Sequence, residues 1–177
     1  MATINLLPNA DVSNNWTLSS LDNVYALMSD DHSGSVASDT NYLLATSTGK
    51  IFELDFQNFT EAHSSIDSVQ AVTRTGNSGR GQSYEIEMTI NEGASGAFWA
   101  AESSGTITAH FNYKTHTFTN RTTSDGSSAW TNTDIDNLRM KVEITAHSGG
   151  STHATYCYFI VTYTEPLYNS IFFGCNF

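Results

Sequence analysis

Apolar and polar residues alternate along Leu138–Ile144, which is the clearest pattern in the chain. The apolar positions are Leu138, Met140, Val142 and Ile144, and the charged residues Arg139, Lys141 and Glu143 fill the positions between them. A period of two places successive side chains on opposite faces, so it is typical of a β-strand with one buried and one solvated face. We therefore expect a strand over Leu138–Ala146.

A second long strand is predicted directly after the first. The segment His147–Thr152 (HSGGST) supplies the glycines of a turn. From Ala154 to Thr162 bulky or β-branched residues occupy both sets of alternating positions. Such a strand is covered on both faces or contacts another subunit. The pattern predicts two long strands joined by a Ser/Gly turn, with the option that they pair as a hairpin.

Other strand-like segments, separated by turns rich in Gly, Asn and Ser, occur along the rest of the chain. They are Trp16–Leu18, Val24–Met28, Tyr42–Thr46, Lys50–Asp55, Ser68–Thr75, Tyr84–Ile90, Thr106–Asn112 and Thr115–Arg121. No segment shows a clear helical period, and Asn58–Ser65 fits one helical turn at most. Short strands without intervening helices predict an all-β fold, a single antiparallel β-sandwich or jelly roll.

The two ends of the chain differ from its middle. Residues 1–14 are weakly patterned and are expected to form an N-terminal arm, followed by a jelly-roll domain over 15–164. Residues 165–177 form an aromatic C-terminal tail. An exposed apolar tail would promote aggregation, so we expect it to dock on its own domain or on a partner. Its candidate contact residues are Ile171, Phe172, Phe173 and Phe177.

The composition limits the classes of partner. The chain of 177 residues carries a net charge of -11, and such a surface repels the phosphate backbone of nucleic acids. No apolar run approaches the roughly 20 residues that span a bilayer, and the N-terminus lacks the features of a secretory signal. Without a signal, the sequons at Asn15, Asn58 and Asn120 are interpreted as chance matches. Nucleic-acid and membrane partners are therefore not expected.

Two groups of residues could suggest metal or redox chemistry. Carboxylates gather at Asp22, Asp30, Asp31 and Asp39 around His32, but their spacing does not fit an EF-hand loop, so a solvated polar loop is favoured over a Ca²⁺ site. His147 and His153 flank the Ser/Gly turn without a legible third metal ligand. Cys157 and Cys175 are expected to be buried thiols rather than a disulfide. No cofactor or metal is predicted.

Candidate chemistry elsewhere is sparse. No nucleophile motif is present, and no pair of carboxylates stands out for glycosidase chemistry, so the chain is predicted not to be an enzyme. The tryptophans Trp16, Trp99 and Trp130 could line a sugar-binding groove or fill the core. Core or corner packing is favoured for Trp130, where Asp125, Asp134 and Asp136 are interpreted as turn residues. Trp99 is the better candidate for an exposed contact.

Four segments carry a resemblance to a known family. They are Asp39–Tyr42 (DTNY), Ile66–Val72 (IDSVQAV), Ala129–Leu138 (AWTNTDIDNL) and Val161–Tyr163 (VTY). In this order they resemble small jelly-roll virion proteins of tailed, particularly marine, bacteriophages, over about residues 1–164. The resemblance implies a structural protein of the particle, either a head decoration (cement) protein or a tail component, and it implies no catalytic residues. Of these segments, only the Ala-Trp corner is at all specific.

The sequence thus favours two functional hypotheses over a third, a lyase or glycosidase on the same fold. The first is a capsid decoration protein that binds the major capsid protein or neighbouring virion subunits as a homo-oligomer, with a trimer favoured. It would be made in the host cytoplasm and reside in the virion. The second is a carbohydrate-binding module of a tail or host-recognition component, because aromatic residues and Asn/Asp-rich loops on a sandwich suit a surface glycan. Fold alone does not separate them.

Overall fold

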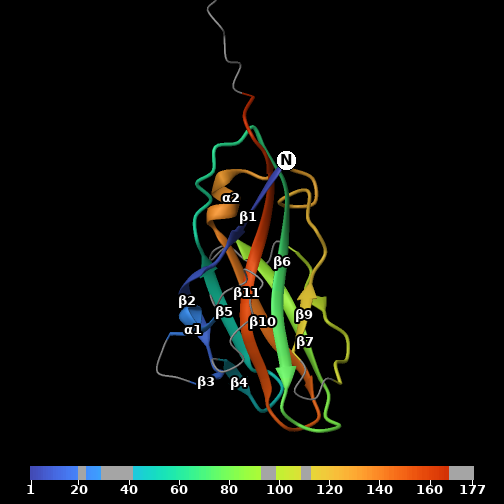
Figure 1. Cartoon of the computed structure of the whole chain (residues 1–177). Helices are drawn as coiled ribbons and strands as arrows, with labels where there is room; N and C mark the ends of the chain where they lie inside the picture. The colour runs from blue at the N-terminus through green and yellow to red at the C-terminus, as the bar shows by residue number, and fades with distance from the viewer. Residues whose placement is uncertain (20–22, 29–41, 93–98, 109–112, 168–177) are drawn as a thin grey trace, which may run out of the picture.

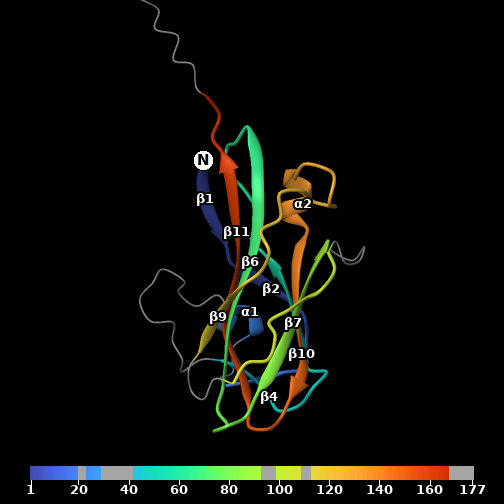
Figure 2. The same cartoon turned by 90° about the vertical axis from the view of Figure 1, so that its right-hand side faces the viewer.

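The computed structural model describes residues 1–19, 23–28, 42–92, 99–108 and 113–167. Their strands form two antiparallel sheets that pack face to face, as Figure 2 shows. The predicted all-β sandwich of the jelly-roll type is therefore confirmed. Within the described part of the chain, no helix is long and apolar enough to cross a membrane.

The two sheets are built around the two long C-terminal strands (Figure 1). The six-stranded sheet has the order β3-β4-β11-β6-β9, and β1 also pairs with β11. Its strands are β1 Ala2–Leu6, β3 Thr17–Leu18, β4 Leu43–Ala45, β6 Ser65–Asn77, β9 Lys114–Thr117 and β11 Thr152–Thr164. The five-stranded sheet has the order β2-β5-β10-β7-β8. Its strands are β2 Pro8–Asn14, β5 Ile51–Phe56, β7 Tyr84–Glu92, β8 Glu102–Ser103 and β10 Leu138–His147.

Strand β10 confirms the alternating pattern. All of its apolar residues from Leu138 to Ile144 are buried between the sheets. Met140 lies opposite Ile90 of β7 in the strand register, so the apolar side chains of neighbouring strands share one face. On the outer face, Arg139 Nε lies 3.8 Å from a carboxylate oxygen of Asp55. The period of two therefore identified which residues enter the core.

The turn after β10 was predicted, but the hairpin option is wrong. Strands β10 and β11 lie in different sheets, so the turn carries the chain from one sheet to the other. Gly149 and Gly150 adopt φ values of 132° and 73°, which favour glycine. A Cβ atom on Gly150 would also lie 2.8 Å from backbone atoms of Gly79 in the adjacent turn. Both constraints explain the glycine pair.

Strand β11 carries bulky residues on both faces, as predicted. Cys157 and Phe159 point inward and are fully buried, whereas Tyr156 and Tyr158 lie half-buried on the outer face. The Cys157 thiol is free, and burial raises its pKa. This agrees with the expectation of a buried thiol for Cys157. Cys175 lies outside the described residues.

The predicted N-terminal arm is wrong for the described structure. Strand β1 pairs antiparallel with β11, from Ala2 opposite Tyr163 to Leu6 opposite Phe159. Strand β2 then pairs with β5 at an edge of the other sheet. The segment is half-exposed or exposed at most positions, so its sequence has little apolar patterning. Edge-strand pairing through the backbone does not require such a pattern, and residues 1–14 belong to the sandwich.

One predicted strand is a helix. Val24–Met28 forms the short helix α1, whose Val24 and Met28 side chains are buried. Five consecutive apolar residues fit a strand or a helix equally well, so periodicity could not decide. The carboxylate of Asp11 decides it locally, because it accepts hydrogen bonds from the first backbone N–H groups, at 3.1 Å from Val24 N and 2.6 Å from Tyr25 N.

The Trp130 corner contains the second helix, α2, over Asn132–Asp136. Thr131 caps it, since its side chain accepts from Asp134 N while the Asp134 carboxylate accepts from Thr131 N. The indole N–H of Trp130 donates to the carbonyl of Arg121 at 2.9 Å. Trp130 is therefore a corner residue, as predicted, whereas Asn58–Ser65 forms no helical turn.

The edge strands near the middle of the chain were predicted with the wrong bounds. In the segment Thr106–Asn112, Ile107 forms an isolated bridge with Tyr84, and residues 109–112 lie outside the described part. Strand β9 ends at Thr117 rather than at Arg121. The two-residue strand β8 was not predicted, because two residues show no period. These short edges border the candidate site.

Candidate functional site

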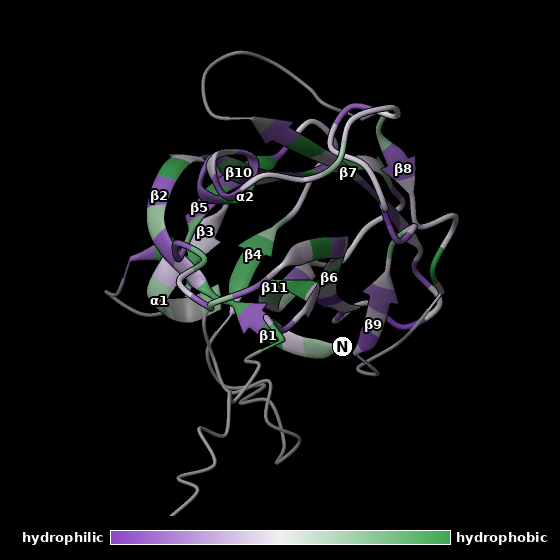
Figure 3. Ribbon diagram, turned by 90° about the horizontal axis from the view of Figure 1, so that it is seen from above, coloured by the Kyte–Doolittle hydropathy of each residue, from purple (hydrophilic) through white to green (hydrophobic). Residues whose placement is uncertain are grey.

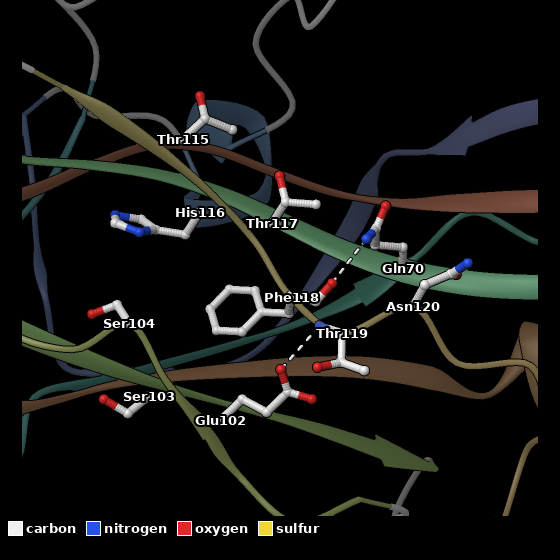
Figure 4. Close-up of a pocket in the computed structure, with 10 residues that line it drawn as sticks. All are labelled: Gln70, Glu102, Ser103, Ser104, Thr115, His116, Thr117, Phe118, Thr119 and Asn120. Atoms are coloured by element: carbon white, nitrogen blue, oxygen red, sulfur yellow. Dashed lines mark hydrogen bonds between the residues drawn. The ribbon is translucent and has the colours of Figure 1, made fainter.

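A groove opens between the edge strands β8 and β9. Figure 3 shows these two strands on the same side of the molecule, each at the end of its layer. The groove has a volume of about 470 Å³. Its lining is almost entirely made of uncharged polar residues: Gln70, Ser103, Ser104, Thr115, Thr117, Thr119 and Asn120, joined by Glu102, His116 and Phe118 (Figure 4). The sandwich is therefore open to ligands along this side.

The segment after β9 forms the wall of the groove. Phe118 is buried, and its backbone N–H donates to the carbonyl of Ala71 at 3.0 Å. Its carbonyl accepts from Gln70 Nε2 at 2.9 Å, a bond drawn in Figure 4. Because successive residues of an extended chain point in opposite directions, burial of Phe118 leaves Thr117 and Thr119 exposed. One apolar side chain thus anchors a polar wall.

Glu102 fixes the opposite end of this wall. One of its carboxylate oxygens accepts from the backbone N–H of Thr119 at 2.9 Å, and the other forms an ion pair with the guanidinium of Arg121. Both side chains are only partly exposed. The carboxylate therefore holds the segment after β9 against β8, and Arg121 compensates its charge.

Three side chains of the groove have no such partner among the described residues. Thr117, Thr119 and Asn120 are exposed, and within the described part of the chain their side chains make no hydrogen bond. A threonine hydroxyl can donate one hydrogen bond and accept two, and an asparagine amide offers both donors and acceptors. These groups are available to a ligand without breaking an existing bond.

His116 lines the groove from β9 and connects it to the core. Its Nε2 atom lies 2.9 Å from the hydroxyl of Thr75, and this hydroxyl lies 2.9 Å from that of Tyr84. Thr75 and Tyr84 are fully buried. Burial, and then the positive charge of Lys114, lower the pKa of His116, while burial raises the pKa of Tyr84 to about 12. His116 is therefore neutral at neutral pH.

Trp99, the predicted exposed contact, lies next to the groove but is half-buried. It packs against the core, and the guanidinium of Arg121 covers its ring at 4.4 Å from the ring centroid. A cavity of about 10 Å³ that Trp99 lines shares Glu102, Phe118 and Thr119 with the groove. With one face covered by Arg121, Trp99 is not an open stacking platform, and its contact role stays a prediction.

The other tryptophans fill the interior. Trp16 is 4% exposed and Trp130 5% exposed, so neither lines the groove. Trp16 packs edge-on against Phe52, with ring centroids 5.2 Å apart. Asp125 accepts from the backbone N–H groups of Ser127 and Ser128, which lowers its pKa. Asp125 is therefore a turn residue, as predicted.

The remaining candidates form no site in the described residues. His153 stacks on Tyr42 with ring centroids 4.1 Å apart and bonds to Tyr113 through Nδ1 at 3.0 Å. His147 lies in the other sheet, and the described residues hold no group of three His, Cys, Asp or Glu side chains that could bind a metal. The remaining predicted sites lie outside the described residues: Asp22, Asp30, Asp31, His32, Asp39, Ile171, Phe172, Phe173 and Phe177.

The groove was not predicted from the sequence. The segment Thr115–Asn120 (THTFTN) alternates like an ordinary edge strand, and only its unusual content of hydroxyl side chains sets it apart. The groove also needs Glu102 and Gln70, which are distant in sequence and meet the segment only in the fold. A long-range arrangement of this kind leaves no spacing that a local pattern could reveal.

Comparison with known proteins assigns the chain to no family. No family model matches the chain, and no curated protein matches it. Three solved structures of similar fold are the CBM36-1 domain of a multidomain xylanase from the hindgut metagenome of Trinervitermes trinervoides, the C-terminal CBM6 of LamC, a marine laminarinase from Zobellia galactanivorans, and a Stig cyclase from Fischerella.

These similarities are distant. The identities to the three structures are 9%, 11% and 9%, and the TM-scores are 0.45, 0.43 and 0.44. The matches cover 93%, 91% and 93% of this chain, and 100%, 99% and 100% of the other chains. The three include carbohydrate-binding modules and a cyclase, and none is a phage structural protein. At this distance they support no conclusion about the function of this chain.

Proposed function

We propose that this domain binds carbohydrate, without catalysis, in the groove between β8 and β9. The observation that carries the proposal is the lining of the groove, in which Thr117, Thr119 and Asn120 hold free hydrogen-bonding groups beside a buried anchor, Phe118. Sugars present many hydroxyl groups, and a few convergent polar side chains can fix their orientation. This supports the second hypothesis from the sequence over the first.

The charges favour a neutral glycan. Glu102 is compensated by Arg121, and no lysine or arginine lines the groove among the described residues. The whole chain carries a net charge of -11, which repels uronic-acid or sulfated polymers. A neutral oligosaccharide needs no cationic residue in the groove and is not repelled by the negative charge of the chain. Hydroxyl–hydroxyl and hydroxyl–amide bonds would then supply the orientation of the ligand.

The same residues argue against glycosidase chemistry. Hydrolysis of a glycosidic bond ordinarily needs two carboxyl groups on either side of the bond. Of the described residues that line the groove, Glu102 alone carries a carboxyl group, and its oxygens already bind Thr119 N and Arg121. Binding without turnover is therefore the function that this geometry supports.

The test is titration calorimetry with a panel of neutral hexasaccharides: cellohexaose, xylohexaose and laminarihexaose. We expect at least one to bind, and we expect Asn120→Ala and Thr117→Val each to weaken binding by about three- to tenfold, the effect of one lost hydrogen bond. Polygalacturonate, a polyanion, should not bind. If none of the neutral sugars binds at millimolar concentration, the proposal is wrong.

Matched substitutions outside the groove serve as controls. Asn58→Ala removes an exposed asparagine amide from a loop, and Thr3→Val removes an exposed threonine hydroxyl from β1. Neither residue lines the groove. Both variants should bind the sugar as the parent chain does. Equal losses in the groove and control variants would place the binding site elsewhere.

The role in a virion stays a prediction. Its support is the resemblance of the four sequence segments to phage virion proteins, together with the apolar composition of residues 167–177. Under this hypothesis the chain binds the major capsid protein or neighbouring subunits as a homo-oligomer and resides in the particle. Quantitative mass spectrometry of purified virions tests it, and absence at stoichiometric copy number would exclude it. A glycan-binding groove is compatible with a tail or host-recognition component.

A further inference from the structure

A chain of three polar groups runs from the core of the sandwich to the groove. Tyr84 belongs to β7 in one sheet, whereas Thr75 and His116 belong to β6 and β9 in the other. The hydroxyl of Thr75 lies 2.9 Å from Tyr84 Oη and 2.9 Å from His116 Nε2. Figure 4 shows the His116 ring among the residues that line the groove. The chain therefore links a fully buried phenol to the binding surface.

The available protons determine which group donates in each of these two hydrogen bonds. Tyr84 is fully buried, and its hydroxyl has Thr75 as its one hydrogen-bond partner among the described residues. A buried donor left without an acceptor is costly, so the phenol donates to Thr75. The single proton of the Thr75 hydroxyl then goes to His116 Nε2, which must accept it. The reverse direction would leave the phenol proton without an acceptor, and donation from both Tyr84 and His116 to Thr75 would leave the buried Thr75 proton without one.

The second ring nitrogen of His116 is consequently protonated. In a neutral imidazole one nitrogen accepts and the other carries the proton, and the hydrogen bond of one nitrogen sets the state of the other. Nδ1 has no partner among the described residues, and it is not among their buried polar atoms that lack a partner, so it reaches solvent. Among the described residues its N–H has no acceptor, so it is available to a ligand in the groove that His116 lines.

We propose that Tyr84 and Thr75 hold His116 in the Nδ1–H tautomer, so that it donates a hydrogen bond to an oxygen atom of the sugar bound in the groove. The sugar-contact part of this inference rests on the proposed function, whereas the tautomer does not. His116 is then a specificity residue that demands an acceptor at one position of the ligand, and Tyr84 and Thr75 are positioning residues that never touch the ligand. The lowered pKa of His116 agrees with a neutral ring.

The tautomer can be measured without any ligand. Long-range ¹H–¹⁵N spectra of the ¹⁵N-labelled full chain at neutral pH should show, for His116, a protonated Nδ1 and an unprotonated Nε2. Thr75→Ser keeps the hydroxyl and should keep this state. Thr75→Val removes the hydroxyl that donates to Nε2, so the ring loses the bond that fixes its tautomer and the Nε2–H form should rise. A parent spectrum with protonated Nε2 would overturn the inference, as would a tautomer that Thr75→Val leaves unchanged.

Sugar binding tests the contact. His116→Asn keeps an amide close to the position of Nδ1, whereas His116→Gln places its amide near Nε2. In the hexasaccharide titration we expect His116→Asn to bind within about threefold of the parent chain and His116→Gln to bind about tenfold more weakly, the scale of one lost hydrogen bond. Equal affinities of both variants and the parent would overturn the contact.

The two measurements separate the possible failures. Binding of a hexasaccharide together with the Nε2–H tautomer would overturn this inference and leave the proposed function standing. The Nδ1–H tautomer without binding of any neutral sugar would overturn the proposed function and the sugar contact, while the direction of the Tyr84–Thr75–His116 chain would stand. Circular dichroism of each variant shows whether it is folded, and where Thr75→Val is not, the parent chain and Thr75→Ser, which should both show a protonated Nδ1, carry the test.

Discussion

The sandwich has two sides at which both sheets end, and the side chains at these two sides differ in character. On one side the edge strands are β2 and β3, and on the other they are β8 and β9. The β2–β3 side is closed by the buried residues Trp16, Val24 and Met28. The β8–β9 side carries the groove, with hydroxyl and amide side chains in place of apolar ones. The same architecture thus yields a sealed side and a grooved side.

The difference shows that side chains, not strand order, decide which side is filled and which carries a groove. Both sides end in edge strands with unpaired backbone groups, which a protein must cover or keep polar. The sealed side covers them with the helix α1, held in place by Asp11. On the groove side the segment after β9 is held by the buried Phe118 and by the carboxylate of Glu102. We therefore expect substitutions on the sealed side to affect stability and substitutions in the groove to affect affinity.

The largest effect should follow from Trp16→Ala on the sealed side. Removing a buried indole leaves a cavity beside Phe52, and such substitutions cost about 3–5 kcal/mol of the free energy of unfolding. Urea denaturation monitored by circular dichroism measures the loss. Sugar affinity of the folded variant should be unchanged, and a parallel loss of affinity would show that the two sides are not independent.

A smaller effect is expected for Asp11→Ala. Its carboxylate accepts from the N–H groups of Val24 and Tyr25, so the variant should lose about 1–2 kcal/mol, the usual value of an N-terminal helix cap. The matched change in the groove, Asn120→Ala, breaks no hydrogen bond among the described residues and should stay within about 0.5 kcal/mol. Comparable destabilisation of both variants would remove the distinction between the sides.

The free energy of unfolding should also decrease as the pH falls below the ordinary histidine pKa of 6.5. The pKa values of His116 and His153 are lowered from 6.5 by burial, with a further contribution from Lys114 for His116. The unfolded chain therefore binds protons first, so the free energy of unfolding is highest above pH 6.5 and decreases as the pH falls through the folded pKa values. The Asp67 and Asp125 carboxylates, whose pKa values are lowered, titrate below this window.

Denaturation midpoints between about pH 7.5 and about pH 5 measure this dependence. His116→Asn, on the groove side, should flatten the curve, because one of the two histidines no longer titrates. His153→Asn should flatten it as well, although His153 lies away from the groove against Tyr42. A curve that neither variant changes would assign the dependence to other groups.

The smallest effect on the fold is expected for the loss of the C-terminal tail. Strand β11 ends at Thr164, so a chain ending at Glu165 keeps every described strand of both sheets. It should retain β-rich circular dichroism and melt cooperatively, while losing self-association or capsid attachment in sedimentation experiments. Replacing Ile171, Phe172, Phe173 and Phe177 with serine in the full chain should have the same result. An unfolded truncated chain would make the tail part of its own core.

The sequence predicted those parts of the fold that depend on a repeated local pattern. The period of two located β10 and its buried face, because every second residue from Leu138 to Ile144 enters the core. It could not locate β1, which is held by backbone pairing with β11 and lacks a strong apolar face. It could not distinguish α1 from a strand, because five apolar residues lack a period and the capping carboxylate of Asp11 is distant in sequence.

The candidate site was less predictable for a related reason. Its residues gain their meaning from neighbours that are far away along the chain. In the sequence His116 is an isolated histidine, and only the fold places it next to Thr75. Trp99 was predicted to be an exposed contact residue, yet Arg121 covers its ring. Local patterns report burial, whereas a binding groove is defined by what several edges of the fold leave uncovered.

The position of β11 also has a consequence for the synthesis of the protein. It is the last described strand along the chain, yet it pairs with β1, β4 and β6 and so holds the six-stranded sheet together. The ribosome must therefore complete the chain to Thr164 before this sheet can form. Until then the strands made earlier lack their central partner. Such non-local pairing favours slow folding and exposes strand edges, so chaperones that bind nascent chains should find this domain late in its synthesis.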